Sequence, residues 1–233
     1  MTLNLRDFDI TPERGFLTPY EMDAVKLPAV FGPIQLAGKH LSDYTCSGRV
    51  RVFLDRLPEI DMAAELPKLD HTQKNLLMIH YSFIVQTYVW GEANPPAYLP
   101  RNLAVPYCAL CDDLGMFPLL PYSSYTLDNW GKLEKDGPIT LENIYVIQNF
   151  LDGQDENWFI MVHIEIEAKA GAALAAIPAL LDAVKAGDKA AVKSGLETIR
   201  ASWQLINPVF GRMPERCDPY VYYHRVRPYI HGW

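Results

Sequence analysis

The sequence predicts an all-α, mainly helical fold. Three segments carry this prediction: residues 71–91 are apolar on nearly every face, residues 158–187 continue into an Ala-rich run, and residues 188–210 open on an aspartate that can cap a helix. The stretch IEIE at residues 164–167 alternates like a strand, but the Ala-rich continuation over more than about four turns favours helix. Strands are therefore expected to be few and short.

The first seventy residues predict an irregular arm and two short helices. Prolines at 12, 19, 28 and 33 and glycines at 15 and 32 interrupt residues 1–36. Residues 38–70 have apolar side chains at mixed helical spacings, and Pro58 and Pro67 divide them.

The middle of the chain predicts a central helix between connectors. Residues 71–91 should form a buried helix that Gly91 ends. The proline-rich residues 92–106 predict a connector, and residues 107–116 a short helix that stops at Gly115. Residues 117–140 predict a loop, a short helix and an exposed loop, and residues 140–151 a further helix.

The last third predicts two long helices and a short one. Pro178 should kink or divide the helix of residues 158–187, and Asp188 should cap the next one. Residues 207–219 predict a loop, and residues 219–233 a final helix.

Composition excludes some partners. The 233 residues have a net charge of −7 and no basic stripe, so neither nucleic acid nor an anionic membrane is an expected partner. The start has no secretory signal and no apolar run is long enough to span a membrane, so we expect a cytoplasmic protein. The CxxC of Cys108 and Cys111 has no second metal-binding pair, which favours free thiols.

Common catalytic motifs are missing from the sequence. It has no GxGxxG after a strand, no GxxxxGK[ST], no HExxH and no GxSxG. The sequence therefore gives no support for nucleotide-dependent catalysis, zinc-dependent hydrolysis or nucleophilic catalysis.

One histidine lies in an apolar helical run. Phe159, His163 and Glu167 are four residues apart and share one helix face. The ring of His163 is either satisfied by Glu167 or a backbone carbonyl, or it is a polar group in the roof of an apolar pocket. The spacing leaves both interpretations open.

Two further segments could line a pocket. Arg227 lies among aromatic residues, namely Tyr222, Tyr223, Tyr229 and Trp233, and its guanidinium is either stacked and ion-paired or available to a ligand carboxylate. Residues 121–130, PYSSYTLDNW, offer hydroxyls and aromatic faces that suit a pocket but are equally common where a helix meets a loop.

Three blocks of sequence resemble the indoleamine 2,3-dioxygenase family almost end to end. They are YLPRNLAVPYCALCDDLGMFPLLPYSSYTLDNW, DENWFIMVHIEIEAKAG and RCDPYVYYHRVRPYIHGW, and the N-terminal RGFLTP fits as well. The resemblance implies a helical haem enzyme that inserts O2 across the indole 2,3 bond of L-tryptophan to give N-formylkynurenine. It also implies a small N-terminal helical domain and connector, residues 1–145, over a larger haem domain that residues 146–233 only begin.

The resemblance also implies the site residues on the distal side of the haem. Arg227 would pair with the substrate carboxylate, Phe159 and Tyr222 would pack on the indole, and His163 would lie nearest O2 and the indole N–H. The remaining substrate wall would comprise Tyr125, Thr126, Ile160 and Ile230. The haem itself would contact Tyr122, Phe159 and His163.

The sequence departs from the family pattern at informative points. Some members have serine at the position of His163 and an aromatic residue at that of Ile160, so pocket polarity and volume should differ. The family continues past the final GW with the part that holds the proximal histidine ligand, so no metal ligand is assigned within these residues. We expect a C-terminal fragment of the same protein as a partner, with a short homologue as the alternative.

Two other functions remain open at this stage. A haem oxygenase of the same fold could act on a different indole, and a helical binding module could have lost the haem-ligating half.

Overall fold

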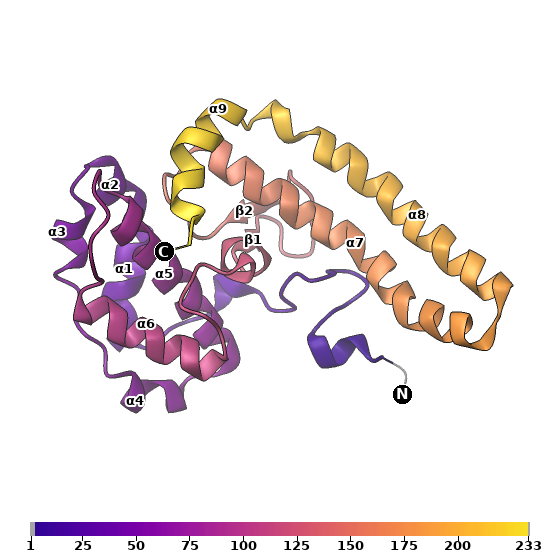
Figure 1. Cartoon of the computed structure of the whole chain (residues 1–233), viewed down its shortest axis with the longest axis horizontal. Coiled ribbons are helices and arrows are strands. Elements are labelled where there is room, and N and C mark those ends of the chain that lie inside the picture. Colours follow the sequence, from indigo (N-terminus) through magenta and orange to yellow (C-terminus); the bar gives the residue numbers. More distant parts are fainter. Residues whose placement is uncertain (1–2, 233) are drawn as a thin grey trace.

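The computed structural model describes residues 3–232 and confirms the all-α class. Helices α1 to α6 gather in one part of the molecule, whereas α7 and α8 form a long antiparallel hairpin that extends from it (Figure 1). In chain order the α-helices are α1 (Gly32–Lys39), α2 (Leu41–Cys46), α3 (Val50–Leu54), α4 (Met62–Glu65), α5 (His71–Trp90), α6 (Arg101–Leu114), α7 (Gln154–Ala186), α8 (Lys189–Gly211) and α9 (Pro219–Val221).

Helix α5 is the predicted central helix. The Asp70 carboxylate accepts a hydrogen bond from the Gln73 backbone N–H at 2.8 Å, and the Gln73 side chain accepts one from the Asp70 N–H at 3.1 Å. This reciprocal pair satisfies two backbone donors at the helix start. The helix is buried without a break from Leu76 to Val89 and ends before Gly91, as predicted.

Several predicted elements differ in the structure. Residues 38–70 contain the end of α1, three further short α-helices, α2 to α4, and a 3-10 turn, rather than two helices. Helix α6 begins at Arg101, within the expected connector. Residues 140–151 are not helical: β2 (Ile144–Val146) pairs antiparallel with β1 (Trp130–Lys132). Asn143, just before β2, donates to the carbonyls of Glu134 and Pro138 and so fixes the turn that brings the strands together.

The prolines of the long hairpin do not break its helices. Helix α7 continues through Pro178, and α8 continues through Pro208 to Gly211, so the expected loop at residues 207–219 starts later. The two helices pack closely: a Cβ at Gly195 would lie 2.9 Å from Leu180 Cδ1. Asp188 caps α8 as predicted, accepting from two backbone N–H groups at 3.0 Å each.

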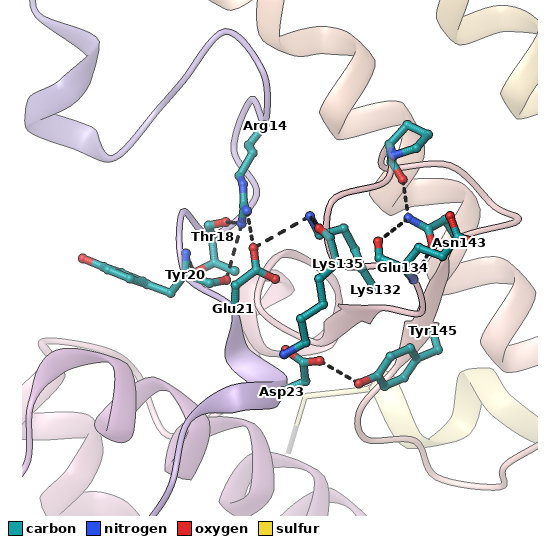
Figure 2. Close-up of polar contacts among 11 residues, drawn as sticks. Arg14, Thr18, Tyr20, Glu21, Asp23, Lys132, Glu134, Lys135, Asn143 and Tyr145 are labelled. Atoms are coloured by element: carbon teal, nitrogen blue, oxygen red, sulfur yellow. Dashed lines mark hydrogen bonds and ion pairs between the residues drawn. The ribbon is translucent and has the colours of Figure 1, made fainter.

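The N-terminal arm is irregular, as predicted, but firmly anchored. The Arg14 guanidinium donates to the Thr18 carbonyl at 2.9 Å and pairs with Glu21 at 2.5 Å (Figure 2). Farther along, the Tyr145 hydroxyl on β2 donates to Asp23 at 2.9 Å. The Arg14 bonds hold the arm together, and the Tyr145 bond ties it to the β-hairpin.

One hydrophobic core joins the first helices to α7. Its fully buried members come from the arm, α1 to α3, α5, α6 and α7, and they include Phe31, Leu41, Leu54, Phe83, Leu110 and Ile160. All four cysteines are free; Cys46 and Cys108 are exposed, and Cys111 and Cys217 are buried. Within residues 3–232, no helix is both long enough and apolar enough to cross a bilayer.

Candidate functional site

Three segments distant in sequence meet at the base of α7. They are the π-helical turn Ser123–Leu127, the first turns of α7, and the π-helical turn Tyr222–Val226 that follows α9. The Tyr125 and Tyr222 hydroxyls, one from each π-helical turn, are hydrogen-bonded at 3.2 Å. Because π-helical turns occur frequently at functional sites, their meeting marks this region as the candidate site.

Aromatic rings form the surface of the site. The Phe159 ring stacks on Tyr222, with ring centroids 4.0 Å apart and planes at 22°. The Phe159 and His163 ring centroids are 4.3 Å apart, and Tyr122 meets His163 edge-on with centroids 6.5 Å apart. The structure therefore brings Tyr122, Tyr125, Phe159, His163 and Tyr222 together.

The His163 ring is oriented by a backbone carbonyl rather than by Glu167. Its Nδ1 lies 2.7 Å from the Phe159 carbonyl oxygen, which can only accept, so Nδ1 carries the proton. No hydrogen bond joins Nε2 to any other residue that the structure describes, and the ring is only half-buried. Of the two interpretations, the carbonyl bond supports the structural one, and the unbonded Nε2 leaves room for the functional one.

Glu167 binds Tyr122 rather than His163, a contact that the sequence spacing did not reveal. The Tyr122 hydroxyl donates to its carboxylate at 3.1 Å. Burial and the neighbouring Glu167 charge both raise the pKa of Tyr122, although 47% of the residue remains exposed. Tyr122 is thus held in place as a neutral hydroxyl beside His163.

Arg227 is exposed and lies over an aromatic ring. Its guanidinium carbon is 5.1 Å from the centroid of Tyr223, which is 56% exposed. Among the described residues, no ion pair involves Arg227. Burial raises the pKa of nearby Tyr222, and the Arg227 charge partly opposes that rise. The guanidinium is therefore stacked, as one sequence interpretation has it, but it has no ion-pair partner among the described residues, so binding of a ligand carboxylate stays a prediction; Trp233 lies outside the described residues.

The remaining candidates lie deeper. Ile160 is fully buried in the core, and Ile230 packs against that core while half-buried. Thr126 is also fully buried, and its hydroxyl has no hydrogen-bond partner within residues 3–232. A buried hydroxyl without a partner loses the hydrogen bonds that it would make in water. Ile160 therefore does not reach the open aromatic surface, whereas Thr126 lies beside Tyr125 in the same π-helical turn.

A buried carboxylate fixes the entry into α7. Glu156 accepts the backbone N–H groups of Phe150 at 2.7 Å and Leu151 at 2.9 Å. Phe150 in turn stacks on Tyr229 at 5.0 Å. Sequence reasoning did not single out Glu156, because nothing in its spacing distinguishes it from a solvated first-turn acid.

Glu156 gives the protein a pH-dependent stability. Burial raises the pKa of this carboxyl to about 7 from its ordinary 4.5, despite the two backbone bonds. The folded state therefore keeps a proton that the unfolded chain releases, and stability should fall as pH rises from about 4.5 to about 7. The whole effect is on the order of 3 kcal/mol, taking about 1.4 kcal/mol per pH unit.

Urea unfolding of wild type and Glu156→Gln across this pH range checks the effect. We expect the variant to be less stable at every pH, since its amide N–H faces a backbone N–H, and to have a shallower slope between pH 4.5 and 7, where Asp128, whose pKa burial raises to about 6, still contributes. Parallel curves for the two proteins would assign the slope to other groups.

The residues fit one face of a planar, largely apolar cofactor. Phe159 and His163 are half-buried and Tyr122 keeps 47% exposure, so these three side chains could face such a group, and Nε2 of His163 is free to interact; Tyr222 is buried and stacks against Phe159. Within residues 3–232, no group of three or more His, Cys, Asp or Glu side chains could hold a metal ion.

Comparison with known proteins shows the family of this chain. The family model described as Indoleamine 2,3-dioxygenase matches residues 4–233. Indoleamine 2,3-dioxygenase 1 of Rattus norvegicus is 33% identical over 98% of the chain and 56% of its own length, and indoleamine 2,3-dioxygenase 2 of Homo sapiens is 30% identical over 99% and 56%. A protein of Haliotis madaka named Myoglobin is 28% identical over 99% of the chain and 58% of its own length. The chain thus spans just over half the length of these relatives, and it belongs to the indoleamine 2,3-dioxygenase family.

Proposed function

We propose that this chain forms the distal wall of a haem-dependent dioxygenase that cleaves the indole 2,3 bond of L-tryptophan with O2. The observation that carries the proposal is the stacked Phe159–Tyr222 pair, together with Arg227, which directly follows the Tyr222–Val226 turn, is exposed and has no ion-pair partner among the described residues. An indole and a carboxylate are the two recognition elements of tryptophan, and an aromatic face and a planar guanidinium match them.

The proposed roles follow from these positions. Arg227 binds the substrate carboxylate, and Phe159 and Tyr222 pack on the indole. Tyr125 and Thr126 border the substrate from their π-helical turn, while Ile160 and Ile230 support the wall from the core behind it. This arrangement orients the indole edge and excludes water, which are the chain's own contributions to rate.

Tyr122, Phe159 and His163 would contact the haem. When bound, haem supplies the redox chemistry that activates O2. Because Nδ1 of His163 is committed to the Phe159 carbonyl, Nε2 is the atom that can accept the indole N–H and hold the ring in register. His163 thus positions the substrate and need not remove a proton.

We further propose the domain division of residues 1–145 and 146–233, and a C-terminal segment of the same protein as partner. That segment would supply the proximal histidine. About two fifths of the length of the relatives lies outside the match.

A haemin titration tests the proposal. We expect a Soret band shift and reduction-sensitive spectrum when the chain is co-expressed with the segment, and none of comparable strength for the chain alone. A complex that forms but binds no haem would overturn the haem assignment.

Two other functions keep some support. The Haliotis relative is named Myoglobin, so membership of the family does not by itself fix the reaction. A haem protein of this fold could act on a different indole, and a chain without haem could serve as a binding module. Turnover assays with tryptophan, tryptamine and substituted indoles separate the first, and the haemin titration separates the second.

Replacing His163 with serine tests its positioning role. We expect a changed kcat with activity retained, and a loss smaller than the roughly hundredfold that removal of a general acid or base costs. The assay is formylkynurenine absorbance on the haem-loaded enzyme. Complete loss in a folded, haem-loaded variant would show that His163 is essential to the chemistry.

A further inference from the structure

Helix α8 carries two adjoining apolar faces, and α7 covers only one of them. Apolar residues follow the alternating four-three spacing of a heptad along α8: Val192, Leu196, Ile199, Trp203, Ile206 and Phe210. Such spacing places all six side chains along one seam. The seam is typical of a helix that packs against other helices on two sides.

The exposures divide the seam into two rows. Ile206 is buried against α7, and Val192 and Ile199 are half-buried. The alternate row is open: Leu196 is 54%, Trp203 56% and Phe210 61% exposed. In Figure 1 no other described element lies along the outer side of α8. We call this row of Leu196, Trp203 and Phe210 the open seam.

A groove accompanies the open seam near the tip of the hairpin. Its volume is about 600 Å3, and Val184 of α7 (59% exposed) and Val192 and Leu196 of α8 supply its apolar lining. Large exposed apolar strips of this kind mark interaction sites in folded proteins.

The charges beside the groove are mainly positive. Lys189, Lys193 and Arg200 line it together with the single acid Glu197, which lies 3.9 Å from Lys193. No ion pair among the described residues involves Lys189 or Arg200. A second copy of α8 would place like charges opposite one another, whereas an acidic flank on the partner would complement them.

We propose that the open seam is the docking site for an amphipathic helix with acidic flanking residues, supplied by the part of the family's length that this chain does not span. The length is available, because the match covers only 56% of the rat and human relatives. The inference rests on the companion segment proposed above and names the surface that receives it. The docked helix forms a three-helix layer with α7 and α8.

A designed peptide tests the chemistry of the partner without haem or tryptophan. The peptide has about three heptads with leucine at the seam positions and glutamate at the flanks, and its control has lysine at the flanks. We expect the glutamate peptide to bind the chain at least about tenfold more tightly than the lysine peptide, with the difference shrinking at high salt. Equal affinities would overturn the charge argument.

Trp203→Glu is the matched variant, because Trp203 is central in the open seam and already exposed. We expect at least about a tenfold loss of peptide affinity with unchanged helical content by circular dichroism. Phe117→Glu serves as control: Phe117 is 83% exposed and lies in the loop after α6, so its variant should bind as wild type does. Equal effects of the two substitutions would overturn the site.

A second experiment tests which polypeptide supplies the docked helix. The chain is co-expressed with the portion of the rat relative that lies outside the match, and we expect co-purification that Trp203→Glu reduces at least about tenfold. If the peptide binds but the rat segment does not co-purify, the docked helix does not come from that segment of the family. If the chain forms concentration-dependent dimers that Trp203→Glu dissociates, the occupant of the open seam is a second copy of this chain, and the proposal is wrong. A chain that fails the haemin titration can still pass all these tests, so the two proposals fail separately.

Discussion

Replacing Arg227 with alanine is expected to raise the KM for tryptophan at least about tenfold, the scale of a lost charge-assisted hydrogen bond. The guanidinium lies over exposed Tyr223 and has no ion-pair partner among residues 3–232, so it is available to a carboxylate. Its removal leaves no buried charge unpaired. The loss should therefore be seen in substrate binding and not in stability.

Two comparisons isolate the carboxylate contact. Tryptamine has no carboxylate, so its KM should be the same for wild type and Arg227→Ala. Arg227→Lys should recover part of the tryptophan affinity, because lysine keeps the charge but loses the planar fork. A tryptophan KM that Arg227→Ala leaves unchanged would remove Arg227 from the site.

Replacing Gly171 with alanine is expected to destabilise the protein by about 2 kcal/mol, within the range for overpacked positions. A Cβ at Gly171 would lie 2.9 Å from the Gly15 nitrogen and closer still to the Pro12 carbonyl oxygen. Gly15, with φ of +61°, would meet the Glu167 carbonyl in the same way. The arm and α7 thus approach backbone to backbone, and neither can yield as a flexible side chain would.

Urea unfolding and limited proteolysis of the arm measure this effect. Alanine is the better helix former by about 1 kcal/mol, so any net loss in Gly171→Ala reports the arm contact. Gly211→Ala is the control, because nothing lies within 4 Å of a Cβ there. If both variants are as stable as wild type and equally resistant to protease, the arm does not pack on α7 as the structure shows.

The sequence predicts elements well where the local pattern and the packing agree. Residues 71–90 are apolar all round and begin with a capping box, and Asp188 caps α8 through its own carboxylate. Sequence-based prediction fails where contacts with distant residues determine the secondary structure. Residues 144–146 have a helical pattern locally but pair with residues 130–132.

Prolines show the same limit. Pro178 predicts a kink or division and residues 207–219 predict a loop, yet α7 continues through Pro178 and α8 continues through Pro208.

For the candidate site, the residue identities came from family resemblance and their arrangement from the fold. Spacing alone placed Glu167 beside His163, whereas the structure pairs Glu167 with Tyr122. The two π-helical turns could not be foreseen, because one extra residue in a helical turn leaves no pattern in the sequence.

Tryptophan turnover by the chain co-expressed with the remaining family segment decides whether this wall belongs to a dioxygenase. With ferrous haem and O2, we expect N-formylkynurenine to accumulate, seen by its absorbance, and its rate at low tryptophan to fall in Arg227→Ala. A folded complex that binds haem but leaves tryptophan and every indole tested unchanged would contradict the proposed function.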